Sequence, residues 1–170
     1  MDQTFELLPR DLKPYREGNT GVPYVHRFES GKPGPHVLVN ALTHGNEFCG
    51  MVAATHLLDH AIRPKVGTLT VSFANVEAYE SFDTADPFKS RLLVHNLNRI
   101  WSSQWLDGKE DSPELRRARE MRPVVAAADH ILIYLRLRVL AGNGAAYVIK
   151  NHNDTSDAVR IPLTANRFAF

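Results

Sequence analysis

The hydrophobic positions of the chain follow two patterns, which predict a series of strands and helices. Strand-like runs rich in β-branched and other apolar residues lie at 22–28 (VPYVHRF), 35–42 (PHVLVNAL), 68–76 (TLTVSFANV) and from residue 130 onward (HILIYLRLRVL). Turn-forming residues, ESGKPGP, separate the first two runs. These two runs are therefore predicted to pair as a hairpin.

Helical spacing begins after Gly45. The apolar residues that recur there near a period of 3.6 are Phe48, Met51, Val52, Leu58 and Ile62. Pro64 follows them as a stop signal. A second helix is predicted from Ser112, its N-cap, to about Asp129, and Pro123 is expected to kink or divide it. Alternating strands and helices favour an α/β domain with a mostly parallel or mixed sheet flanked by helices, whose sites gather at the carboxyl ends of the strands.

The composition limits the classes of function. The chain of 170 residues is 44% hydrophobic and 23% charged, which suits one domain with one core. Its 20 basic and 19 acidic side chains nearly cancel, so neither nucleic acid nor a membrane is expected as a partner. There is no apolar run long enough to span a bilayer, and the first residues lack the apolar core of a leader. The single cysteine, Cys49, suits a reducing compartment, so a cytoplasmic protein is expected.

His44 and Glu47, in the stretch ALTHGNEFCG, are candidate metal ligands. His44 follows the end of the 35–42 strand and Glu47 lies at the start of the next helix, with Gly45 allowing a tight turn between them. Imidazole nitrogen and carboxylate oxygen are common zinc ligands. Two simpler interpretations remain open, because the helix dipole alone favours Glu47 in a first turn and His44 is also compatible with an ordinary loop histidine.

A second group of candidates lies in SRLLVHNLNRIW, at 90–101. Arg91 and Arg99 carry planar guanidinium groups suited to binding a carboxylate, and Asn98 can donate a further hydrogen bond. By itself this segment also fits a surface loop with two solvated arginines. If it binds substrate, all three residues are expected to line the same cleft as His44.

These motifs together resemble the succinylglutamate desuccinylase/aspartoacylase family, which is related to the zinc carboxypeptidases. The resemblance rests on THGNE, a strand ending in ANVEAYE, a following arginine and NLNRIW, and it extends from about residue 20 to residue 132. It implies a zinc-carboxypeptidase-like fold and one Zn²⁺ per chain. The implied activity is hydrolysis of an amide or ester bond in a small, anionic N-acyl amino acid.

The resemblance also implies a role for each candidate. His44 and Glu47 match the first two zinc ligands of the family. Arg91 matches the arginine that polarises the scissile carbonyl, and Asn98 with Arg99 matches the pair that holds the substrate carboxylate. Where the family often has Asp-Leu-Asn-Arg, this chain has Asn96-Leu97-Asn98-Arg99, so an acidic group behind the metal ligands is expected to be missing.

The resemblance ends after residue 132. The family has a third zinc ligand in an Asp-x-His-Ser/Thr motif at the end of the next strand, and the expected aspartate and histidine fall at Ile133 and Leu135. Residues 133–170 also contain no glutamate for a general base and are too few for the β-rich C-terminal domain of the family. We therefore expect an incomplete, truncated zinc-hydrolase-like domain at 1–132 and a divergent tail at 133–170. A frameshift near codon 133 and a genuine divergence both explain this tail.

Other histidines are weaker candidates for the third ligand. His152 lies in a polar stretch, KNHND, that can fold back, whereas His130 is expected at the entry end of its strand, away from the site. His56 and His60 have a spacing that can bind metal but are interpreted as solvated. His95 is interpreted as a neighbour of the site.

Two hypotheses of different class follow from the sequence. The first is a zinc-dependent hydrolase whose third protein ligand is not identified. The second is a non-catalytic remnant of a hydrolase fold that binds a carboxylate through Arg91 and Arg99. A basic stretch in the second predicted helix is interpreted as a solvated face rather than a nucleic-acid patch. Its residues are Arg116, Arg117, Arg119 and Arg122.

Overall fold

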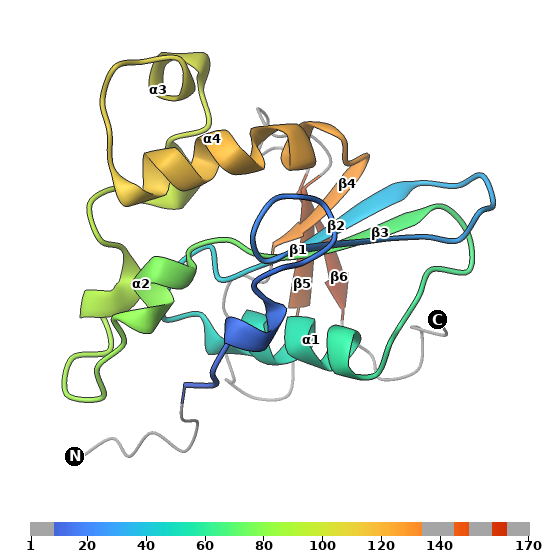
Figure 1. Cartoon of the computed structure of the whole chain (residues 1–170), viewed down its shortest axis with the longest axis horizontal. Coiled ribbons are helices and arrows are strands. Elements are labelled where there is room, and N and C mark those ends of the chain that lie inside the picture. The colour runs from blue at the N-terminus through green and yellow to red at the C-terminus, as the bar shows by residue number, and fades with distance from the viewer. Residues whose placement is uncertain (1–8, 134–144, 150–157, 163–170) are drawn as a thin grey trace.

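The computed structural model of the protein describes residues 9–133, 145–149 and 158–162, which form a mixed sheet with helices on both faces (Figure 1). The strand order is β1-β3-β2-β4-β5-β6. The central strand β2 pairs in parallel with β3 and β4, and all other pairs are antiparallel. The predicted α/β fold with a mixed sheet is confirmed. The strands are β1 (Val25–Glu29), β2 (His36–Ala41), β3 (Thr68–Phe73), β4 (His130–Ile133), β5 (Ala145–Ile149) and β6 (Ala158–Pro162).

The predicted hairpin between 22–28 and 35–42 is wrong. Both segments are strands, but β1 pairs with β3, from Val25 opposite Ser72 to Glu29 opposite Thr68, so β3 separates β1 from β2. The connection between β1 and β2 runs past the amino end of β3, where the Gly67 amide donates to the Lys32 carbonyl at 2.9 Å. The residues of β2 are buried almost throughout, so β2 takes the centre of the sheet between two parallel neighbours. This leaves β1 at an edge.

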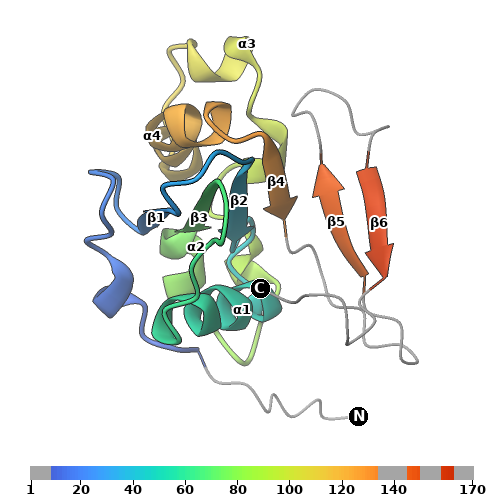
Figure 2. The ribbon, with the colours of Figure 1, turned by 90° about the vertical axis from the view of Figure 1, so that its right-hand side faces the viewer.

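Two long helices cover opposite faces of the sheet (Figure 2). Helix α1 (Phe48–Asp59) lies on one face, and α4 (Pro113–Ala126) lies on the other together with the short α3 (Ser103–Leu106). Helix α2 (Val76–Glu80) follows β3. Three 3-10 turns complete the described helical elements: Lys13–Tyr15, Lys89–Arg91 and Leu97–Arg99. Within the described residues, none of the helices has the length and apolar character needed to cross a bilayer.

Each face of the sheet has its own hydrophobic core. Alternate residues of β2 and β3, such as Val39 and Phe73, pack against α1 in the first core. Leu97, Leu115 and Met121 belong to the second core, on the α4 side. A buried polar contact joins β2 and β3 near their carboxyl ends, where Asn40 accepts a hydrogen bond from the Ser72 hydroxyl at 2.6 Å.

The buried face of α1 differs from the predicted one at Val52, which is 45% exposed.

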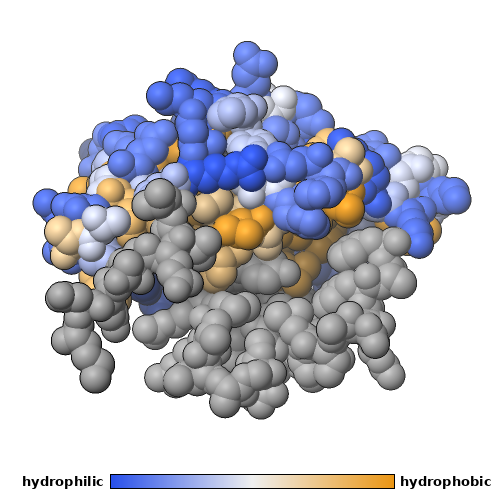
Figure 3. Space-filling model, turned by 90° about the horizontal axis from the view of Figure 1, so that it is seen from below, coloured by the Kyte–Doolittle hydropathy of each residue, from blue (hydrophilic) through white to orange (hydrophobic). Residues whose placement is uncertain are grey.

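The α1 side of the molecule shows hydrophobic residues across its middle, bordered on one side by hydrophilic residues (Figure 3). A cavity of about 260 Å³ on this side is lined by apolar residues that include Val37, Leu57, Val66 and Leu132. Val37 lies near the amino end of β2, so this cavity is at the opposite end of the sheet from His44.

Helix α4 begins as predicted and ends differently. The Ser112 hydroxyl accepts a hydrogen bond from the Leu115 amide at 3.1 Å, which confirms the N-cap. The predicted division at Pro123 is wrong, because one helix runs through it to Ala126. Pro123 lies in the last turn, so its missing N–H removes only one backbone hydrogen bond close to the helix end.

The cap of α4 leads to a first prediction. Replacing Ser112 with alanine is expected to lower the free energy of unfolding by about 1 kcal/mol, because the Leu115 amide loses its acceptor. Urea denaturation followed by circular dichroism measures this loss. Ser102 at the start of α3 is the matched control, since its side chain makes no cap hydrogen bond. Equal losses for the two variants would contradict a specific role for the Ser112 hydroxyl.

The edge strand β1 has part of its free backbone covered by a side chain. The Asn19 amide group donates to the Arg27 carbonyl at 2.8 Å and accepts from the Arg27 amide at 2.7 Å. The Asn19 main-chain N–H also donates to the Val25 carbonyl. A side-chain amide thus forms the two hydrogen bonds that a neighbouring strand would form with Arg27.

Candidate active site

The turn that carries His44 begins with an unusual backbone conformation. Leu42, directly after β2, has a φ of 56° and a fully buried side chain. Hydrogen bonds from the amides of Ala74 and Asn75 to the carbonyls of Ala41 and Leu42, both 2.8 Å, hold this segment against the end of β3. A branched residue in the left-handed region is uncommon and costs free energy. The chain therefore leaves the sheet in a fixed direction two residues before His44.

Gly45 is required by close packing. Its φ is outside the left-handed region, but a Cβ at this position would run into the carbonyl oxygen of Ser90 and lie 2.5 Å from backbone atoms of Ala78 and Tyr79. The Gly45 amide also donates to the Arg91 carbonyl at 3.2 Å. The turn thus packs directly on α2 and on the segment that carries Arg91. The sequence had suggested a glycine for the turn itself, whereas its neighbours are what exclude a side chain.

His44 and Glu47 come together in the buried turn. Their side chains face each other with His44 Nδ1 2.7 Å from Glu47 Oε1, and the His44 amide donates to Glu47 Oε2 at 3.1 Å. Both side chains are buried. Glu47 is also the N-cap residue of α1, directly before Phe48, but its side chain makes no cap hydrogen bond to that helix. Its carboxylate is therefore directed at His44 and not used as a helix cap.

The other ring nitrogen of His44 has two neighbours from a distant segment. His44 Nε2 lies 3.0 Å from Asn96 Oδ1 and 3.3 Å from Arg91 Nη2. Asn96 Oδ1 also accepts a hydrogen bond from the Asn98 amide at 2.9 Å, so this oxygen is fixed as an acceptor. The tautomer with Nε2–H donates to Asn96, whereas the tautomer without that proton accepts from Arg91. The sequence identifies Asn96 only as the position where the family often has aspartate, and the structure shows that its amide oxygen faces His44.

This arrangement fits part of a zinc site. With the Nε2 proton donated to Asn96, the Nδ1 lone pair faces a Glu47 oxygen, and two such acceptors at 2.7 Å need a proton or a cation between them. His44 Nδ1 and the Glu47 carboxylate are the atoms that would hold the metal. Across the part of the chain that the structure describes, no group of three His, Cys, Asp or Glu side chains forms a metal site.

Asn98 and Arg99 are placed less directly than Arg91. Asn98 lines a small cavity that also includes Thr43, the residue before His44. The Arg99 side chain is exposed and donates to the Asn98 carbonyl at 2.9 Å. In the described ranges, no hydrogen bond or ion pair links either side chain to His44 or Arg91. The structure therefore brings Arg91 to His44, and leaves the carboxylate-binding role of Asn98 and Arg99 as a prediction.

The remaining histidines are spread over the fold. His130 lies opposite Val37 at the start of β4, at the far end of the sheet from His44, as its strand position predicted. The exposed His56 and His60 lie at the C-terminal end of α1, and their rings are tilted by 35° with centroids 4.0 Å apart. The His95 ring lies 2.8 Å from Glu110 and packs on Trp105. His152 and Leu135 lie outside the described residues, and Ile133 is the last residue of β4.

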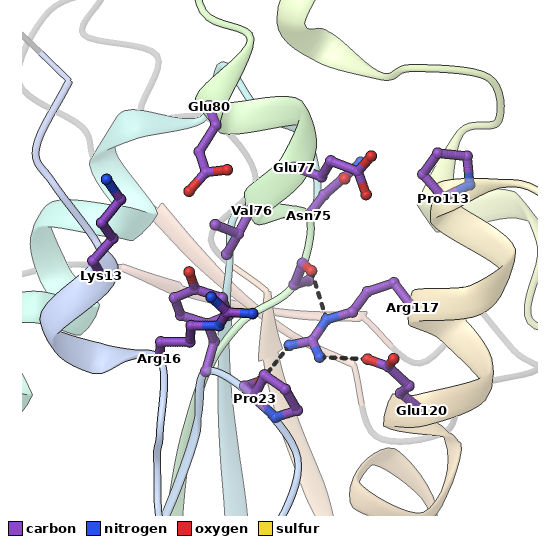
Figure 4. Close-up of a pocket in the computed structure, with 12 residues that line it drawn as sticks. Lys13, Arg16, Pro23, Asn75, Val76, Glu77, Glu80, Pro113, Arg117 and Glu120 are labelled. Carbon is purple, nitrogen blue, oxygen red and sulfur yellow. Dashed lines mark hydrogen bonds and ion pairs between the residues drawn. The ribbon is translucent and has the colours of Figure 1, made fainter.

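A larger cavity of about 580 Å³ lies at the carboxyl end of β3 and does not include His44 (Figure 4). Its most buried charged group is Arg117, whose side chain is only 13% exposed. Arg117 donates to the carbonyls of Pro23, Phe73 and Ala74 at 2.8 to 2.9 Å and pairs with Glu120. Burial lowers the pKa of this guanidinium from its ordinary value. Arg117 is thus a structural link between α4 and the ends of β1 and β3.

The predicted solvated basic face is therefore correct for only part of α4. Arg116 and Arg122 are about half exposed and pair with Asp111 and Asp107. Arg119 instead donates to the carbonyls of Trp105, Leu106, Gly108 and Glu110. Like Arg117, it faces backbone acceptors that a sequence pattern does not reveal.

The sheet, the buried His44–Glu47 pair and the adjacent Arg91 form an α/β domain with a polar site after the carboxyl end of β2. The model of the succinylglutamate desuccinylase/aspartoacylase catalytic domain matches residues 33–132, which is more than half of the chain, and the protein belongs to this family. The matched segment ends at the residue where the resemblance in sequence ends. No curated protein and no solved structure matches the chain.

Proposed function

We propose that the protein is a zinc-dependent hydrolase that cleaves the amide or ester bond of a small, anionic N-acyl amino acid. The observation that carries this proposal is the buried His44–Glu47 pair with Arg91 beside it, in a chain of the succinylglutamate desuccinylase/aspartoacylase family. An imidazole nitrogen and a carboxylate at one point form a donor set that zinc accepts. The guanidinium of Arg91 beside them can stabilise an oxyanion by its positive charge and its N–H donors.

Each residue has a distinct role in the proposed reaction. His44 Nδ1 and the Glu47 carboxylate would hold the metal, which supplies an activated water and a Lewis acid when bound. Arg91 would stabilise the oxyanion that forms at the scissile carbonyl. Asn98 and Arg99 would bind the substrate carboxylate and fix its orientation. Asn96 would accept the Nε2 proton of His44 in a hydrogen bond, which would leave Nδ1 free to act as a ligand.

We further propose that the hydrolase-like domain covers residues 1–132 and that 133–170 is a divergent tail. The end of the family match at residue 132 supports this division. The nucleotide sequence tests its origin: the other two reading frames downstream of codon 130 would encode Asp-x-His-Ser/Thr and a later glutamate if a frameshift had occurred. If neither frame contains them, the frameshift is excluded and the non-catalytic function becomes the better proposal.

The alternative function is a non-catalytic domain that binds a carboxylate. It is favoured by one observation, the lack of a three-residue metal cluster among the residues that the structure describes. In this case Arg91 and Arg99 would bind an anion without hydrolysis. Measuring zinc binding at His44 and Glu47 distinguishes the zinc-dependent hydrolase from the non-catalytic carboxylate-binding domain.

The zinc site itself gives the second prediction. With two protein ligands, the purified chain is expected to bind zinc weakly, and His44→Ala is expected to weaken binding at least about tenfold further, because a ligand and its hydrogen bonds are lost together. Equilibrium dialysis measures both affinities. His56→Ala is the control for zinc bound at the exposed histidine pair on α1. Tight one-to-one binding by the wild type would mean that another group completes the site, and loss of binding only in His56→Ala would contradict the assignment.

The third prediction concerns the residue behind His44. Asn96→Asp is expected to raise the affinity for zinc about tenfold, because a carboxylate accepts the Nε2–H bond more strongly and makes the imidazole a better donor. Zinc titration monitored by calorimetry measures the change. Gln104→Glu on the exposed surface of α3 adds a similar charge elsewhere and is the control. An equal gain in both variants would show a general effect of charge.

A further inference from the structure

The carboxylate of Glu114 is buried beneath the segment that carries Arg91 and Asn96. Glu114 lies in the first turn of α4 and is fully buried. Its Oε1 accepts a hydrogen bond from the Leu93 amide at 2.6 Å, and its Oε2 accepts from the amides of Val94 and His95 at 3.3 and 3.2 Å. Asn75 adds a side-chain donor to Oε1 at 3.4 Å. Three successive backbone N–H groups thus converge on one carboxylate, an arrangement that binds anions.

The segment held in this way connects the two neighbours of His44 Nε2. Arg91 stands at one end of it and Asn96 at the other, and both lie within 3.3 Å of that nitrogen. We call residues 91–96 the arginine loop. Its middle residues form no helix or strand. Val94 is 57% exposed and Leu93 is also exposed, so their side chains do not anchor the loop by burial. The hydrogen bonds to Glu114 therefore attach the backbone of residues 93–95 to the domain.

The charge of Glu114 suits this attachment. Burial by itself raises the pKa of a carboxyl group, but the hydrogen bonds from the amides of Leu93 and His95 together outweigh burial and lower the pKa of Glu114 below its ordinary value. The group is thus a carboxylate at neutral pH, and hydrogen bonds to a charged acceptor are stronger than neutral ones. An uncharged glutamine would present one acceptor and one donor to a site that contains only donors.

We infer that Glu114 is a positioning residue that sets the arginine loop over His44, and that the N–H groups of residues 93–95 form a receptor for a small carboxylate once its side chain is removed. Glu114 touches neither the candidate metal ligands nor a substrate position, so it acts through the loop. Any effect of Glu114 on hydrolysis, through the position of Arg91, rests on the proposed function. The effect of Glu114 on the position of the arginine loop does not depend on it.

The test uses the full chain with Glu114→Ala, Glu114→Gln and the control Glu110→Gln. The exposed Glu110 carboxylate pairs with the His95 side chain, so its variant removes a nearby charge without removing an acceptor of the loop backbone. Hydrogen exchange of the backbone amides of residues 93–95 and zinc affinity by dialysis are measured for each. Sodium formate, with sodium chloride at the same ionic strength as reference, is added to every sample.

Glu114→Ala is expected to lose at least about tenfold protection at the three amides, because their charged acceptor is gone, with the rest of the sheet still protected. In Glu114→Ala, formate is expected to restore that protection and the zinc affinity lost with it. In Glu114→Gln, formate is expected to restore little of either. Unchanged protection in Glu114→Ala would overturn the inference, as would a loss spread over the whole domain that formate does not reverse. If Glu114→Ala does not fold, selective loss in Glu114→Gln supports the inference and wild-type protection in that variant overturns it. Absence of hydrolysis in the wild type would overturn the proposed function and leave the exchange result valid.

Discussion

Gly45→Ala is expected to lower the free energy of unfolding by about 3 kcal/mol, because the new methyl group has no space to enter. It would meet backbone atoms of Ser90, Ala78 and Tyr79, and backbone cannot move aside as a side chain can. The displaced turn carries His44, so zinc binding should fall together with stability. Chemical denaturation and zinc titration of the same variant measure the two effects.

The control for Gly45→Ala is Gly31→Ala. Gly31 has a φ of 73°, and no atom lies within 4 Å of the position that a Cβ would take, so alanine there meets backbone strain alone. That strain is expected to cost about 1 kcal/mol and to leave zinc binding unchanged. If the two variants lose the same stability, the tight packing around Gly45 is not what excludes a side chain.

Arg117→Met is the second change with a large expected effect, again about 3 kcal/mol. The methionine keeps much of the apolar stem but leaves the carbonyls of Pro23, Phe73 and Ala74 without their donors, at about 1 kcal/mol for each hydrogen bond. Arg117→Lys is expected to recover only part of the loss, because one ammonium group cannot reach three carbonyls with the geometry of a guanidinium. Thermal or urea denaturation gives the comparison.

The neighbouring Arg116→Met provides the control for this prediction. Arg116 is 54% exposed and its partner Asp111 is also exposed, so the ion pair is expected to contribute at most about 0.5 kcal/mol. The two variants remove the same charge from adjacent positions of one helix. A similar loss for both would mean that net charge, rather than the three carbonyl contacts, determines the stability of α4.

The parts of the fold that could be predicted from sequence are those set by nearby residues. The helix start at Ser112 follows from a cap contact only three residues long, and the approach of His44 to Glu47 is likewise a contact between residues three apart. The mixed α/β sheet follows from the alternation of strand and helix patterns. In each case the sequence signal and the physical contact occupy the same short stretch.

The parts that were missed depend on contacts between distant segments. Asn96 reaches His44 across 52 positions, and the loop amides at 93–95 reach Glu114 across about 20. The hairpin prediction failed for a similar reason, because the pairing of β1 with β3 is decided by which strand takes the buried centre of the sheet. Arg117 was interpreted as solvated because a helical pattern does not show where free carbonyls of other segments lie.

The amide group of Asn19 bears on how the protein behaves at high concentration. An unpaired edge strand offers its backbone to the edge of another molecule, which is a common first step toward aggregation. At β1, the N–H and C=O of Arg27 are already hydrogen-bonded to Asn19, so a second molecule that adds a strand here must first displace that side chain. Loss of this amide, for example by Asn19→Ala, would leave a ready template at the edge of the sheet. Asn19 can therefore be regarded as a gatekeeper of solubility, separate from the candidate site around His44.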